Sequence, residues 1–76
     1  MSKYVNILQK WIDRISQHKD ERMGQALMNT LREHDITTFD IITVENPDAD
    51  CFYKDELLDT TLEFIYNRYR KTSTTH

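Results

Sequence analysis

The acidic residues around the only proline suggest calcium binding as the first chemistry to test. Asp48, Asp50 and Asp59 lie in a loop and near the start of an expected helix, and Ca²⁺ prefers such carboxylate oxygens. An EF-hand loop also needs a glycine at its sixth position and a bidentate glutamate at its twelfth. Counted from Asp48, these positions hold Tyr53 and Asp59, so the spacing does not fit. We therefore interpret the acids as a solvated loop that caps a helix, and we predict no metal ligands.

Nucleophilic chemistry would depend on the single cysteine. Cys51 has no partner at the C-x-x-C spacing, and a base would have to come from His18 or His34, which are distant in the sequence. One glycine is too few for a phosphate-binding loop, and neither G-x-S-x-G nor H-E-x-x-H occurs. A partly buried cysteine and a histidine that complements a helix dipole explain these residues without catalysis. The sequence thus predicts a protein that is not an enzyme and binds no cofactor.

The length of the chain limits how any site can be positioned. Its 76 residues allow one domain, predicted at residues 1–71 and followed by a disordered tail at residues 72–76. A domain of this size buries only about 60% of its unfolded surface, and one cysteine excludes an internal disulfide framework. Association with another chain is then the remaining way to enlarge the core. No apolar run of membrane-spanning length and no signal-peptide pattern occurs, so we expect a cytoplasmic protein without membrane contact.

Two helices are expected in the first half of the chain. Residues 3–18 have an apolar stripe about 160° wide, and Ser2 is placed to cap the helix. The stripe contains Tyr4, Val5, Ile7, Leu8, Trp11, Ile12 and Ile15. A second helix is predicted at residues 21–33, with Asp20 as its N-cap. The only glycine, Gly24, falls inside it and costs about 1 kcal/mol relative to alanine. This cost is either tolerated or marks a close helix–helix crossing, and we favour the crossing.

The segment at residues 37–44 has two possible structures. Thr37 and Asp40 fit a capping box, which favours a short helix, but the β-branched residues that follow would also suit a strand. No other segment resembles a strand, so a strand here could pair only with a second copy of the chain. We therefore predict a short helix.

The last helix is predicted at residues 51–70, after a loop that contains Pro47. Its apolar residues occupy two sides, one of them with the 4-3-4 spacing of a coiled coil. A helix with two apolar sides has two surfaces to bury, and a second subunit could cover one of them. Alternatively, the helices of the same chain cover both. The sequence predicts an all-α domain of three to four helices that forms a homodimer, with self-association through Leu57, Leu58, Leu62, Phe64, Ile65 and Tyr69.

The distribution of charge indicates the class of partner. Residues 1–34 carry a net charge of +2, residues 35–67 have nine acids and one lysine, and residues 68–71 add three positive charges. An acidic surface with interleaved aromatic residues is typical of a contact with a basic patch on another protein. The leading hypothesis is a small regulator or inhibitor, which in one version mimics nucleic acid. The predicted binding residues are Asp48, Asp50, Phe52, Tyr53, Asp55, Glu56, Asp59 and Glu63.

The alternative hypothesis is a dimeric transcriptional regulator that binds DNA. The segment Thr38–Glu45 would be its recognition helix, but it contains no arginine or lysine, and the charge therefore disfavours nucleic acid. A dimer would have to present Lys10, Arg14 or the basic residues 68–71 instead. Three short segments resemble the small enterobacterial biofilm-regulating connector proteins, which implies a connector-type regulator. These segments contain no catalytic motif and support no family assignment; they are Leu8 with Trp11-Ile12, Met23-Gly24-Gln25-Ala26 and Thr61-Leu62-Glu63.

Overall fold

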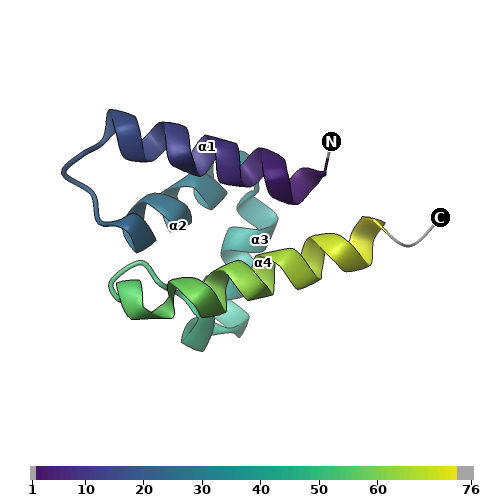
Figure 1. Ribbon diagram of the computed structural model, residues 1–76. Coiled ribbons are helices and arrows are strands. Elements are labelled where there is room, and N and C mark those ends of the chain that lie inside the picture. The colour runs from purple at the N-terminus through teal and green to yellow at the C-terminus, as the bar shows by residue number, and fades with distance from the viewer. Residues whose placement is uncertain (1, 74–76) are drawn as a thin grey trace.

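The computed structural model describes residues 2–73 and folds them into helices and short helical turns (Figure 1). No strand occurs among these residues, which confirms the predicted all-α class and the short helix near residue 40. Helices α1 and α4 lie in front in Figure 1, with α2 and α3 behind them. The helices are α1 (Lys3–Gln17), α2 (Met23–His34), α3 (Ile36–Asp40) and α4 (Leu58–Ser73). The turns are the π-helical η1 (Ile41–Glu45) and the 3-10 turns η2 (Pro47–Ala49) and η3 (Asp55–Leu57).

The start of α1 follows local sequence rules, whereas the start of α2 does not. Ser2 caps α1 as predicted, because its hydroxyl accepts a hydrogen bond of 3.1 Å from the backbone N–H of Val5. The prediction of Asp20 as the cap of α2 is wrong. The helix begins two residues later than expected, and the side chain of its N-cap residue Arg22 makes no capping hydrogen bond to the first turn. The cap comes from a distant residue: the N–H of Gly24 donates to Oδ1 of Asp55 at 2.9 Å.

Gly24 marks a close approach, but not the predicted crossing of two helices. A Cβ at this position would overlap the backbone carbonyl oxygen of Cys51, and it would lie 2.9 Å from Oδ1 of Asp55. The Sγ of Cys51 in turn donates to the Gly24 carbonyl oxygen at 3.5 Å. The loop before α4 therefore packs directly on the backbone of α2, and glycine is the residue that leaves room for it.

The loop contacts also explain why the last helix starts later than predicted. The N–H of Phe52 donates to Oδ1 of Asp50 at 2.9 Å, and the guanidinium of Arg22 donates to the Phe52 carbonyl oxygen at 2.8 Å. These bonds hold residues 51–54 in a loop, so the prediction of a helix from residue 51 is wrong. Helix α4 extends to Ser73 and includes the first two residues of the predicted tail. The rest of that tail, residues 74–76, lies outside the described residues.

Helix α3 starts at a different cap from the one predicted. Asp35 is its N-cap, and Oδ1 of this carboxylate accepts from the N–H of Thr38 at 3.3 Å. The predicted cap Thr37 is instead a residue of the first turn. The helix continues without interruption into the π-helical turn η1, and Ile42 of that turn is fully buried.

A single core joins three of the helices to the turns and the loop between them. It contains apolar residues from α1, α2, η1, the loop and α4, namely Ile7, Leu27, Met28, Leu31, Ile42, Ala49, Cys51, Ile65 and Tyr69. Three threonines are buried among them, and each hydroxyl has a partner: Thr30 donates to Ala26 O at 2.7 Å and Thr61 to Ala49 O at 2.5 Å, while Thr38 donates to Asp35 at 2.6 Å. In the described part of the chain no helix is long and apolar enough to span a membrane.

Candidate functional site

The loop before α4 forms an acidic cleft with an exposed aromatic ring at its edge. Four of the predicted binding residues meet there, which are Asp48, Asp50, Tyr53 and Glu56. The cleft has a volume of about 500 Å³, and we call it the acidic cleft below. Its full lining is Pro47, Asp48, Asp50, Tyr53, Lys54, Glu56 and Leu57.

Two neighbouring aromatic rings give this loop an inner and an outer side. Phe52 is half-buried and packs against the core, whereas 80% of the surface of Tyr53 is exposed. The two rings meet edge to face, with centroids 4.7 Å apart. Phe52 thus anchors the loop, and the contact supports the Tyr53 ring in a position open to a partner.

Some of the predicted acidic residues hold the fold together, whereas others are only exposed. Asp55 lies outside the lining of the cleft, and its carboxylate caps α2 at Gly24. Asp50 lines the cleft and also holds the loop by its bond to the N–H of Phe52. Asp59 and Glu63 are exposed on α4 but do not line the cleft. The carboxylates of Asp48 and Glu56 are therefore the ones that an incoming group can use most freely.

The predicted self-association residues of the last helix face the interior to a large extent. Ile65 and Tyr69 are 0% and 4% exposed, so a single folded chain already covers them. Four others are half-buried and pack against the core: Leu57, Leu58, Leu62 and Phe64. The helices of the same chain thus cover much of both apolar sides, as in the alternative considered above.

The single cysteine is a core residue. Cys51 is fully buried, and this burial raises the pKa of its thiol. A thiol with a raised pKa forms little thiolate at neutral pH and is a poor nucleophile. The position of Cys51 therefore agrees with its interpretation as a packing residue.

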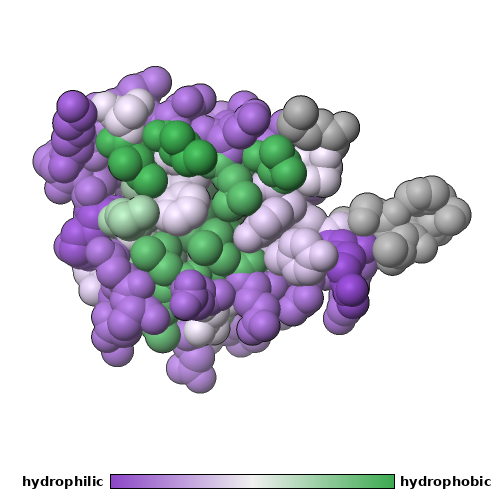
Figure 2. Space-filling model, in the orientation of Figure 1, coloured by the Kyte–Doolittle hydropathy of each residue, from purple (hydrophilic) through white to green (hydrophobic). Residues whose placement is uncertain are grey.

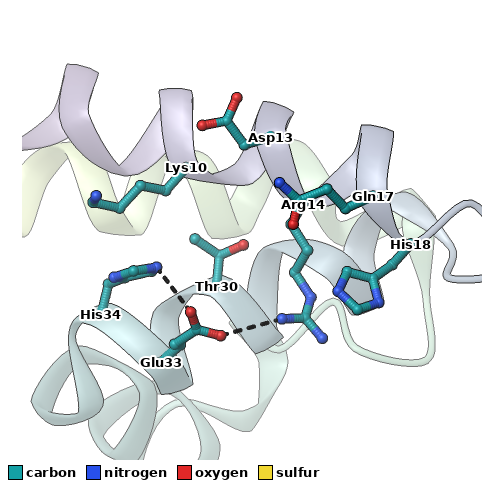
Figure 3. Close-up of a pocket in the computed structure, with 8 residues that line it drawn as sticks. All are labelled: Lys10, Asp13, Arg14, Gln17, His18, Thr30, Glu33 and His34. Atoms are coloured by element: carbon teal, nitrogen blue, oxygen red, sulfur yellow. Dashed lines mark hydrogen bonds and ion pairs between the residues drawn. The ribbon is translucent and has the colours of Figure 1, made fainter.

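A second pocket lies between α1 and α2, with His34 and His18 at opposite ends of it (Figure 3). His18 and His34 both line this pocket of about 350 Å³. Nε2 of His34 lies 3.3 Å from Glu33, and Arg14 binds Glu21 at 2.9 Å and Glu33 at 3.4 Å. The hydrogen bond from Arg14 lowers the pKa of Glu21. Because carboxylates already bind the guanidinium, we interpret these contacts as a polar link between the two helices.

The histidine pocket could not be found from sequence motifs, because its residues come from two helices whose packing was unknown. The described residues contain no group of three side chains that could hold a metal ion.

Comparisons of the chain with protein-family models, with curated proteins and with solved structures found no significant match. The acidic cleft therefore has to be interpreted from its own geometry.

Proposed function

We propose that this protein is a non-enzymatic regulator or inhibitor that binds a basic patch of another protein through the acidic cleft. The observation that supports this proposal is the arrangement of three carboxylates, from Asp48, Asp50 and Glu56, around a cleft with the exposed Tyr53 ring. An arginine or lysine side chain in the cleft would pair with the carboxylates, and its cation would also be attracted to the face of the ring.

The fixed loop makes such a contact more favourable. The bonds of Asp50 to Phe52 and of Asp55 to Gly24 hold the loop before any partner arrives. Less conformational entropy is then lost on binding, because the carboxylates already line the same cleft. The same arrangement supports mimicry of a phosphate backbone as the mode of inhibition. We place this activity in the cytoplasm, where a free thiol such as that of Cys51 stays reduced.

The burial and charge of residues 38–45 give less support to the alternative of a DNA-binding or connector-type regulator. The expected recognition helix runs from α3 into the π-helical turn η1, and its residues Thr38 and Ile42 are fully buried in the domain. Its charged residues, Asp40 and Glu45, would face the phosphates with the wrong sign. A mobility-shift assay with duplex DNA at low salt tests this alternative, and a salt-sensitive shifted complex would replace the protein-binding proposal.

The proposed contact can be tested with a defined cation-rich probe. We expect a short arginine-rich peptide to shift the NMR signals of the residues around the acidic cleft, with an affinity that falls steeply as salt is added. The double substitution Asp48→Asn and Glu56→Gln should weaken this binding about tenfold, because two of the three carboxylates lose their charge. Asp55 is left unchanged, since it caps α2.

A variant with the same change of net charge provides the control. Asp13→Asn and Asp20→Asn remove two exposed carboxylates that do not line the acidic cleft, and binding should stay within about twofold of the original protein. Equal weakening by both variants, or shifts spread over the whole surface, would mean that the acids only solvate the domain. If the cleft binds the peptide, the same two variants identify targets among proteins captured from cells. A true target should bind the control variant and should bind the cleft variant more weakly.

A further inference from the structure

Helix α1 has an apolar side that the core leaves uncovered. Tyr4, Ile7 and Trp11 pack in or against the core. The neighbouring side of the helix instead points outward: Ile12 is 60% and Val5 is 39% exposed. Leu8 and Ile15 are half-buried on the same side and complete a 3-4-3 spacing. We call Val5, Leu8, Ile12 and Ile15 the outer face of α1.

This outer face continues into a larger apolar surface. Figure 2 shows apolar side chains gathered along α1 and across toward α4, with polar side chains above and below them. Tyr66 of α4 is 48% exposed, and its ring meets that of Tyr4 at 5.3 Å. Met23 is also 48% exposed, and its carbonyl oxygen accepts a 3.0 Å hydrogen bond from the Trp11 indole. The exposed apolar residues of three helices thus adjoin one another.

The charged residues of α1 are absent from its outer face. At 100° per residue, Lys3, Lys10 and Arg14 lie on the far side of the helix, and Asp13 lies outside the outer face. The positions that directly flank the outer face on the solvent side are Gln9 and Ser16. An uncharged face can contact an identical face without placing like charges opposite each other, which a symmetric dimer requires. The net charge of the chain, −3, adds little repulsion at longer range.

The area of this surface can be compared with the area that a dimer interface buries. The 15 residues of α1 make a helix about 22 Å long, and a surface that spans α1 and the neighbouring α4 is about 20 Å wide. These dimensions give a projected area of about 450 Å², and the accessible surface that follows the side chains is larger. A standard interface buries about 800 Å² per partner, which is roughly 15% of the 5175 Å² surface of this chain.

We infer that a second copy of this chain covers the outer face of α1, so that the protein is a symmetric homodimer with the acidic cleft of each subunit free. This inference places self-association on α1 rather than on the predicted residues of the last helix. It is independent of the proposed partner of the acidic cleft, because the two surfaces share no residue.

The test is the mass of the protein in solution, by sedimentation equilibrium from about 10 µM to about 1 mM, a range that covers moderate and weak complexes. We expect the original chain to be a dimer and Ile12→Glu to be a monomer with an unchanged circular dichroism spectrum. The dissociation constant of the dimer should rise at least about 100-fold, because each of the two subunits places one unpaired glutamate in the apolar interface.

The control is Val44→Glu, which makes the same chemical change at a site in η1 that is 77% exposed and not part of the apolar surface of α1. This variant should remain a dimer. The inference is overturned if the original chain is monomeric over the whole range, or if Ile12→Glu dimerises as tightly as Val44→Glu does. Peptide binding at the acidic cleft should be the same in the Ile12→Glu monomer, which separates this test from that of the proposed function.

Discussion

Substitution of Gly24 by alanine is expected to destabilise the domain by about 3 kcal/mol, although alanine is the better helix former. Helix propensity alone would make Gly24→Ala more stable by about 1 kcal/mol. The new methyl group, however, would overlap the backbone carbonyl of Cys51 and lie 2.9 Å from Oδ1 of Asp55. A backbone group in a packed loop cannot move aside cheaply, so the steric cost should exceed the gain in propensity.

Denaturation with urea measures this difference, and a second substitution shows which contact causes it. Asp55→Ala removes the cap of α2 and should cost about 1 kcal/mol by itself. If the overlap is with the Cys51 backbone, the double variant should be no more stable than Gly24→Ala. Full rescue by Asp55→Ala would place the conflict at the carboxylate instead. A Gly24→Ala protein more stable than the original would show that the loop does not pack on α2.

The contrast between α1 and the start of α2 shows which parts of the fold local sequence can predict. Helix α1 was predicted to within one residue, because its apolar period and the cap at Ser2 lie within the helix and its flank. The start of α2 was missed because its cap, Asp55, lies 31 residues further along the chain. The close approach at Gly24 was anticipated, but its partner was not, since a glycine does not indicate what packs against it.

The sequence predicted the types of residue in the candidate site but not the role of each one. Acidic and aromatic residues after Pro47 indicated a binding surface, and four of the eight residues do line one cleft. Neighbouring acids have different roles, however: Asp55 caps a helix, while Glu56 lines the cleft. Sequence spacing likewise gave α1 an apolar stripe about 160° wide but could not show which part of it the core would leave exposed.

A partly buried hydrogen-bond network around Asp35 ties α3 to the last helix. Oδ2 of Asp35 accepts from the Tyr69 hydroxyl at 2.5 Å and from the Thr38 hydroxyl at 2.6 Å. Arg68 donates to the Thr38 hydroxyl at 2.8 Å. Burial opposes ionisation of Asp35, but the hydrogen bonds from Thr38 and Tyr69 outweigh it and lower the pKa of the carboxyl group. Burial and the bond to Asp35 raise the pKa of Tyr69.

Asp35→Asn is therefore expected to lower the free energy of unfolding at pH 7 by about 2 to 4 kcal/mol, because three hydrogen bonds, from the N–H and hydroxyl of Thr38 and from the Tyr69 hydroxyl, lose their charged acceptor. The pH dependence of this loss identifies its cause. A carboxyl group with a lowered pKa in the folded state stabilises the fold above its unfolded pKa of about 4, and this stabilisation disappears as the pH falls through the folded value. The original protein should thus lose its advantage over Asp35→Asn progressively as the pH falls below about 4.

Tyr69→Phe provides the matched control, since it keeps the ring in the core and removes only one donor to Asp35. It should cost about 1.5 to 3 kcal/mol at pH 7, and in combination with Asp35→Asn the losses should be smaller than their sum because both break the same bond. Tyr69→Phe should also reduce the loss of stability that the original protein shows above about pH 10, where an unfolded tyrosine ionises and one with a raised pKa does not. Urea denaturation of the four proteins across this range measures both effects. Parallel pH profiles for the original protein and Asp35→Asn would show that the charge on Asp35 does not stabilise the fold.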